Sequence, residues 1–134
     1  WTDPSPSPLR RRFTAWVRNR VDVEAMAAAA RLFEGAHDFS AFRSTACTAP
    51  NPQRTVNRSR LVRCGPLLVY DVVARAFLHS QVRIMAGTLL EVGRGKLTPD
   101  DIRRVLERGD RSQAGPTAPP QGLVLWEIIY PPGM

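Results

Sequence analysis

The side chains of this chain with the most capacity for chemistry are its arginines. Lysine and arginine number 19 against 12 aspartate and glutamate residues, which gives a net charge of +7, and Lys96 is the only lysine. Such an excess is typical of proteins that bind a polyanion: RNA, DNA or an anionic membrane. Guanidinium groups suit phosphate because their planar fork offers paired donors and stacks on bases. The charge therefore favours a nucleic-acid partner over a solvated surface or the codon bias of a GC-rich genome.

The thiols and imidazoles indicate no metal site. Cys47 and Cys64 lack CxxC spacing, and His37 and His79 stand at no recognisable zinc spacing from them. We therefore expect two reduced thiols in an intracellular protein. No apolar run approaches the ~20 residues that span a bilayer, and no signal-peptide core is present near the start, so we expect no membrane partner.

The length of 134 residues suits one domain. We expect an irregular lead-in rich in proline and arginine over 1–20, in which 13–17 fits a strand, one domain over 21–130 and a tail at 131–134. The expected elements are a helix at 23–33 capped by Asp22, one helical turn within 37–43, a hairpin of strands 54–63 and 67–75, helices at 76–92 and 99–108, and a strand at 122–130. This order indicates an α+β fold, an antiparallel sheet with helices packed mainly on one face, as in ferredoxin-like and RRM-like domains.

These elements place two residues of interest. Arg83 lies on the polar side of helix 76–92, opposite an apolar face that contains Met85 and Leu89. From charge and spacing alone, Arg83 is typical of a solvated arginine and Leu123 of ordinary strand core. Strand 67–75 is apolar on both faces, so we expect other elements to pack against both. The helices of this chain cover either both faces or only one of them.

Four blocks of the sequence, in order, resemble the signatures of one enzyme family. They are 35–42 (GAHDFSAF), 54–56 (RTV), 77–93 (FLHSQVRIMAGTLLEVG) and 118–125 (APPQGLVL). The family patterns for the first, third and fourth are G-x-H-D-F-S-x-F, F-L-H-x-x-V-R-x-x-x-G-x-L-x-x-V-G and A-P-x-x-G-L-x-L. Residues 21–130 thus resemble the C-terminal half of the tRNA pseudouridine synthase A (TruA) family.

The resemblance implies an enzyme that isomerises uridine to pseudouridine in the anticodon arm of tRNA. It implies an aspartate that attacks the nucleotide and no metal or organic cofactor. By motif position, Arg83 is the basic residue paired with that aspartate, and Leu123 is the apolar residue against the target base. A guanidinium beside the nucleophile favours its ionised form. We further expect Arg43, Arg54 and His79 to contact RNA, and a homodimer in the cytoplasm or, alternatively, in mitochondria.

The nucleophile itself is the main departure from the family. The family carries it in an R-x-D-x-G-V-H type of loop in the first half of the enzyme, and no aspartate here stands in such a loop. The chain begins at Trp1 inside a proline-rich stretch, as a piece of a longer product would. We expect the N-terminal half of the same enzyme to supply the aspartate, and this fragment alone to be inactive. The alternative is a non-catalytic RNA-binding module or a structural ribonucleoprotein subunit derived from that fold.

Overall fold

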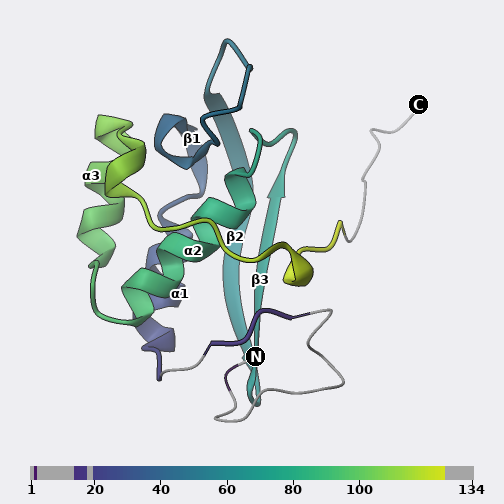
Figure 1. Cartoon of the computed structure of the whole chain (residues 1–134). Coiled ribbons are helices and arrows are strands. Elements are labelled where there is room, and N and C mark those ends of the chain that lie inside the picture. Colours follow the sequence, from purple (N-terminus) through teal and green to yellow (C-terminus); the bar gives the residue numbers. More distant parts are fainter. Residues whose placement is uncertain (1, 3–13, 18–19, 126–134) are drawn as a thin grey trace.

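The computed structural model describes residues 2, 14–17 and 20–125 and has an α+β architecture (Figure 1). Its three-stranded antiparallel sheet has the order β1-β2-β3. Figure 1 shows the helices on one side of this sheet. The predicted fold class is therefore confirmed. The elements are α1 (Val23–Arg31), β1 (Gly35–Asp38), η1 (Ser40–Phe42), β2 (Gln53–Cys64), β3 (Leu67–Ala74), α2 (Gln81–Gly93), α3 (Pro99–Arg108), η2 (Arg111–Gln113) and η3 (Pro120–Gly122).

The core between the helices and the sheet is organised around three phenylalanines. Phe33, Phe39 and Phe42 are fully buried, and the rings of Phe33 and Phe42 meet edge-on with 5.1 Å between their centroids. Met85 of α2 and Ile102 of α3 belong to the same buried cluster. Burying a side chain of this size stabilises a fold by about 1.5–3 kcal/mol. The aromatic cluster therefore holds α1 and η1 against the other two helices.

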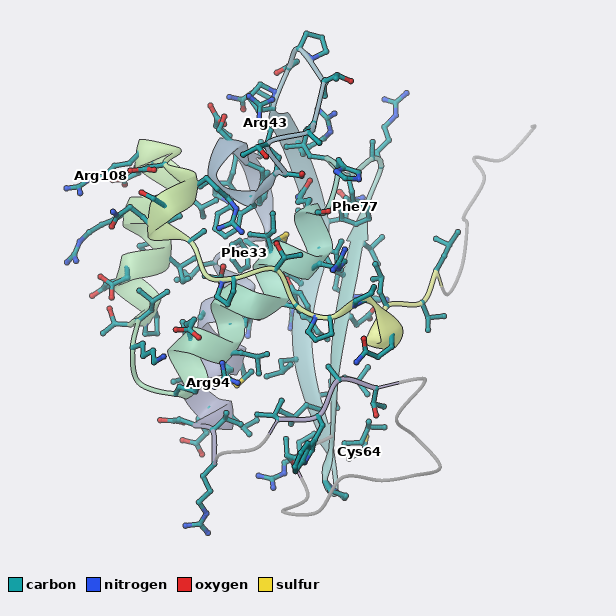
Figure 2. All side chains as sticks on the ribbon, viewed as in Figure 1. Phe33, Arg43, Cys64, Phe77, Arg94 and Arg108 are labelled. Atoms are coloured by element: carbon teal, nitrogen blue, oxygen red, sulfur yellow. The ribbon has the colours of Figure 1, made fainter. Side chains whose placement is uncertain are left out.

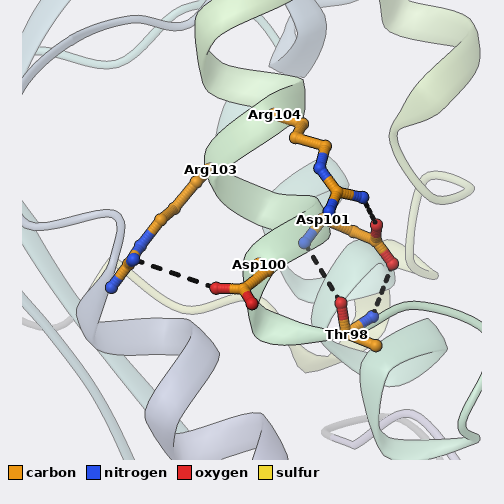
Figure 3. Close-up of polar contacts among 5 residues, drawn as sticks. All are labelled: Thr98, Asp100, Asp101, Arg103 and Arg104. Atoms are coloured by element: carbon orange, nitrogen blue, oxygen red, sulfur yellow. Dashed lines mark hydrogen bonds and ion pairs between the residues drawn. The ribbon is translucent and has the colours of Figure 1, made fainter.

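Capping side chains set where two of the helices begin. Asp22 accepts a hydrogen bond from the Ala25 N–H at 3.1 Å, as predicted for the start of α1. At α3, the Thr98 hydroxyl accepts from the Asp101 N–H at 3.2 Å, and the Asp101 carboxylate accepts from the Thr98 N–H at 2.8 Å (Figure 3). This reciprocal capping box, mainly through the Thr98 N–H, lowers the pKa of Asp101. The limits predicted for α3 are confirmed, whereas α1 ends at Arg31 instead of residue 33.

Helix α2 begins five residues later than the sequence pattern predicts, at Gln81 instead of residue 76. Ser80 adopts the left-handed conformation with φ of 61°, which a continuous helix does not tolerate. The Gln81 side chain accepts a hydrogen bond from the Leu78 N–H at 2.8 Å and so closes a turn in place of the first helical turn. Phe77, inside the predicted helix 76–92, is 39% exposed and lies before the start of α2.

The strand predictions are confirmed at the hairpin β2–β3 and need correction elsewhere. Strand β1 was not predicted, because its four residues show no apolar alternation and become a strand only by pairing with β2. The predicted helical turn within 37–43 is confirmed as η1. Residues 14–17 form no strand, and residue 13 lies outside the described residues. Residues 122–125 join no ladder of the described sheet, and 126–130 lie outside the described residues.

The described helices cover only one face of the hairpin. Tyr70 and Val72 pack against the buried core. Val62 and Val69 are register partners on the other face and are 51% and 41% exposed. This second face, on which Val62 and Val69 lie, is called the open face below. The described helices thus leave two register-paired valines of the hairpin exposed.

Candidate functional site

After α3 the chain runs back across α2 as a closely fitted strap, defined here as residues 114–118 (Figure 1). The Gly115 N–H donates to the Thr88 hydroxyl at 2.9 Å, and that hydroxyl donates to the Ile84 carbonyl at 2.7 Å. A Cβ atom on Gly87 would lie 1.7 Å from the Pro116 carbonyl oxygen. The strap therefore crosses α2 at a separation that requires glycine at position 87.

Arg83 is bound to the end of this strap at two points. Its Nε–H donates to the Ala118 carbonyl at 2.9 Å, and its own carbonyl accepts from the Ala118 N–H at 3.0 Å. The structure thus joins two of the motif blocks that are far apart in the sequence. Among the described residues no carboxylate forms an ion pair with Arg83, although its side chain is half-buried. A half-buried guanidinium without a counter-charge suits a carboxylate from outside the described residues.

Leu123 follows the strap after the short turn η3, where its N–H donates to the Pro120 carbonyl at 3.0 Å. It is the first of three exposed apolar residues: Leu123 is 51% exposed, Val124 60% and Leu125 78%. A Cβ atom on Gly122 would lie 3.2 Å from the Ala15 nitrogen, so the lead-in chain passes close to this point. Leu123 is therefore available to contact a partner and is not part of the core.

Two of the three residues expected to contact RNA brace the loop between η1 and β2. Arg43 donates through Nη1 to the Ala49 carbonyl at 3.0 Å, and Arg54 donates through Nη1 to the carbonyls of Asn51 and Gln53, both at 2.7 Å. Figure 2 shows Arg43 at this loop end of the molecule and Cys64 at the opposite, hairpin end. In both arginines, Nη1 therefore already donates to a backbone carbonyl of this chain.

His79 lies against the same loop with its side chain exposed. Its carbonyl accepts a hydrogen bond from the Ser44 N–H at 3.0 Å. Hydrogen bonds to the backbone of Ala49 and then of His79 lower the pKa of the Cys47 thiol, with a smaller contribution from Arg43. No group of three or more His, Cys, Asp or Glu side chains within the described residues is placed to hold a metal. No described helix has the length and apolar composition needed to cross a membrane.

Comparison with known proteins decides the family. A family model described as tRNA pseudouridine synthase matches residues 29–131. The chain belongs to this family. It is 46% identical over 128 residues to tRNA pseudouridine synthase A of Allorhizobium ampelinum, over 96% of this chain and 49% of that relative. The protein of the same name from Pelobacter propionicus is 45% identical over 127 residues, 95% of this chain and 52% of the relative. The protein of the same name from Geobacter sp. strain M21 is 46% identical over 131 residues, which cover 96% of this chain and 53% of the relative.

The chain spans about half the length of the curated relatives it matches. The aspartates of this pseudouridine synthase segment that the structure describes all have local partners. Each one is bound by a backbone N–H group or by an arginine on the same or a neighbouring element. These aspartates are Asp22, Asp38, Asp71, Asp100, Asp101 and Asp110. None of these aspartates is hydrogen-bonded or ion-paired to Arg83.

Sequence reasoning missed the residues that hold the strap of this pseudouridine synthase segment. Neither Thr88 nor Gly115 was predicted to have a role. Arg111 donates through Nη1 to the Gly115 carbonyl at 2.8 Å and so holds the strap from its other side. The available signal was Gly87, because a glycine inside a helical pattern often marks a close approach of another backbone.

We expect Gly87→Ala to lower the free energy of unfolding by about 1–3 kcal/mol, the usual cost of overpacking. The new Cβ meets backbone atoms of Pro116 and Ala118, which move only if the strap moves. Gly93→Ala gives a comparison on the same helix away from the strap, because its Cβ meets the Met26 sulfur at 2.5 Å, Met26 Cγ at 2.9 Å and Val21 Cβ at 3.0 Å. Urea unfolding measures both variants. Wild-type stability of Gly87→Ala would contradict the role given to the strap.

Proposed function

We propose that this chain is the C-terminal half of a tRNA pseudouridine synthase that isomerises uridine in the anticodon arm of tRNA. The observation that carries the proposal is Arg83, a half-buried guanidinium bound to Ala118 at 2.9 Å and without a described carboxylate partner. Membership of the family supports the reaction. The relatives of about twice the length support a missing half that completes the site.

In this proposal Arg83 pairs with a catalytic aspartate that the other half supplies. The Ala118 carbonyl fixes Nε, so the two Nη groups face the carboxylate and hold it in one orientation. A neighbouring positive charge keeps that carboxylate ionised and therefore nucleophilic. The strap also delivers Leu123, whose exposed side chain packs against the target base once the cleft is complete. The chemistry requires no metal or organic cofactor, because the aspartate is itself the nucleophile.

The partners follow from the exposed surfaces. The open face around Val62 and Val69, together with Leu123 to Leu125, is the surface against which the N-terminal half packs. The net charge of +7 suits tRNA as the substrate. The relatives named above are bacterial, and we place the intact enzyme in the cytoplasm as a homodimer.

The test is to express the full-length reading frame that contains this chain in a bacterial strain lacking its own tRNA pseudouridine synthase A. We expect pseudouridine to return at anticodon-arm positions of the tRNA, as measured by mass spectrometry of purified tRNA. The control is the same reading frame with Arg83→Ala. A stable, tRNA-binding product that restores no pseudouridine would instead identify a non-catalytic RNA-binding module.

A further inference from the structure

An aromatic ring is exposed immediately before α2, in the segment of residues 77–80, which is called the entry turn below. Phe77 is 39% exposed, whereas the three phenylalanines of the core are fully buried. Figure 2 shows Phe77 toward the same end of the molecule as Arg43. Phe77 belongs to a motif block, yet the proposed reaction gives it no role. The entry turn therefore presents a large apolar group whose purpose is still open.

The backbone of the entry turn is fixed by the residue that follows Phe77. Leu78 is 4% exposed and belongs to the core cluster. Its N–H donates to the Gln81 side-chain oxygen at 2.8 Å, and its carbonyl accepts from the Gln81 N–H at 3.0 Å. The Gln81 side chain is itself fully buried. Because Leu78 is anchored inward in this way, Phe77 cannot enter the core without breaking these hydrogen bonds.

The end of the entry turn is strained. Ser80, with φ of 61°, is the only residue other than glycine with a positive φ in the described part of the chain. Such a backbone persists only where the surrounding structure holds it, and strained positions concentrate at active sites and ligand-binding segments. The bond from the Ser44 N–H to the His79 carbonyl, 3.0 Å long, ties the turn to the loop after η1. Helix α2 follows directly, with Arg83 as its third residue.

The residues beside Phe77 in the chain favour RNA as the ligand of the exposed ring. Arg75 and His79 are both exposed, and neither forms an ion pair with a described residue. Sites for unpaired bases combine an aromatic ring, on which the base stacks, with positive charge that attracts the backbone phosphates. The centre of a protein–protein interface is instead depleted in charged residues. The composition around Phe77 therefore fits a nucleic acid better than a protein partner.

We propose that Phe77 is a base-stacking residue whose ring stacks on an unpaired nucleobase of the RNA substrate, next to the site that contains Arg83. This inference deepens the proposed function and rests on it, because it takes RNA to be the ligand. Every base has a π face, so the contact supplies affinity without reading the sequence. The backbone of the entry turn is already fixed, so binding a base restricts little more than the ring itself.

The experiment compares tRNA binding by the full-length protein with that of its Phe77→Ala, Phe77→Leu and Phe77→Tyr variants over a series of salt concentrations. Phe77→Leu is the matched control for apolar bulk, because it keeps a large apolar side chain but has no ring. We expect Phe77→Ala and Phe77→Leu to bind about tenfold more weakly, and Phe77→Tyr to bind within about twofold of the wild type. The slope of log affinity against log salt should be unchanged in all three, because no charge is lost.

Packing of Phe77 against the N-terminal half is the competing role, and urea unfolding of each full-length variant tests it. Stacking on a base predicts that Phe77→Leu unfolds at the wild-type urea concentration and still binds tRNA weakly. Packing predicts the reverse for this variant, with wild-type tRNA binding, and a lower urea midpoint for Phe77→Ala. That pattern, or wild-type affinity in all three variants, would overturn the proposal.

Pseudouridine formation by the wild type is measured separately, so that the two proposals can fail independently. If the wild type forms pseudouridine and the Phe77 variants bind tRNA normally, base stacking is overturned and the proposed function stands. If Phe77→Leu weakens tRNA binding about tenfold but the wild type forms no pseudouridine, base stacking stands and the proposed function fails.

Discussion

We expect the isolated chain of 134 residues to form no pseudouridine in a tRNA transcript, even when protein and tRNA are concentrated enough to bind. The reaction needs an aspartate that is free to attack the nucleotide. Every aspartate that the structure describes is instead engaged in a cap, a turn or an ion pair with an arginine. Asp101, for example, is held by the Thr98 N–H at 2.8 Å and by Arg104 at 2.9 Å, in a capping box remote from Arg83 in the sequence (Figure 3).

The measurement is mass spectrometry of nucleosides after single-turnover incubation, with the full-length protein as the positive control on the same transcript. We expect complete loss in the short chain, because each aspartate that the structure describes is already bound by a backbone N–H group or an arginine. A chain that also fails to bind tRNA would leave the comparison uninformative, so binding is measured in parallel by filter retention. Pseudouridine formed by the short chain, in proportion to its concentration, would show that the nucleophile lies within it.

Local sequence signals predicted the elements that local interactions determine. The start of α3 is encoded by Thr98, Pro99 and Asp101, a capping box with proline at the first helical position, and the structure has the predicted limits. The hairpin turn at Gly65, with φ of 61°, joins strands that the apolar pattern also located. In both cases neighbours in sequence supply the hydrogen bonds, so reading the sequence was sufficient.

The elements that were wrong depend either on contacts between distant parts of the chain or on an unusual backbone conformation. Strand β1 exists because Ala36 and His37 pair with Thr55 and Arg54 across the sheet. No local apolar pattern records that pairing. The late start of α2 depends on the left-handed backbone of Ser80, a conformation uncommon outside glycine and asparagine. Residue-type preferences therefore placed a helix where the structure has a turn.

Only part of the candidate site could be predicted from the sequence, because contacts between distant parts of the chain form the rest. The motif blocks named Arg83 and Leu123, but they did not indicate that Arg83 is tied to Ala118 through both its side chain and its backbone. The strap contacts of Thr88 and Gly115 lie 27 positions apart in the sequence and carry no spacing signal. Packing of one backbone on another is visible only once the fold is known.

In the intact enzyme, Arg83→Ala is expected to abolish turnover, on the order of a thousandfold or more, while leaving tRNA affinity nearly unchanged. The alanine removes the counter-charge that keeps the aspartate ionised and also removes the Nε bond to Ala118. The tRNA affinity of Arg83→Ala is retained because one cation among many phosphate contacts contributes little to binding. Arg83→Lys keeps a point charge but not the planar fork, so we expect a rate loss of about ten- to a thousandfold.

A loosened strap is the competing explanation for such losses, and Arg111→Ala isolates it. Arg111 holds the Gly115 carbonyl at 2.8 Å and contributes nothing to the aspartate's charge, so its removal loosens the strap while Arg83 remains. The backbone bond between the Ala118 N–H and the Arg83 carbonyl, 3.0 Å long, persists in all three variants and limits the movement. Single-turnover rates and tRNA affinity at fixed salt are measured for each variant.

If Arg111→Ala loses as much rate as Arg83→Ala, Arg83 acts by positioning the strap. If Arg83→Ala weakens binding strongly and the bound complex reacts normally, Arg83 is a phosphate contact. Pairing of Arg83 with the aspartate predicts neither result. It predicts that only the Arg83 variants lose most of the single-turnover rate, while tRNA binding is retained.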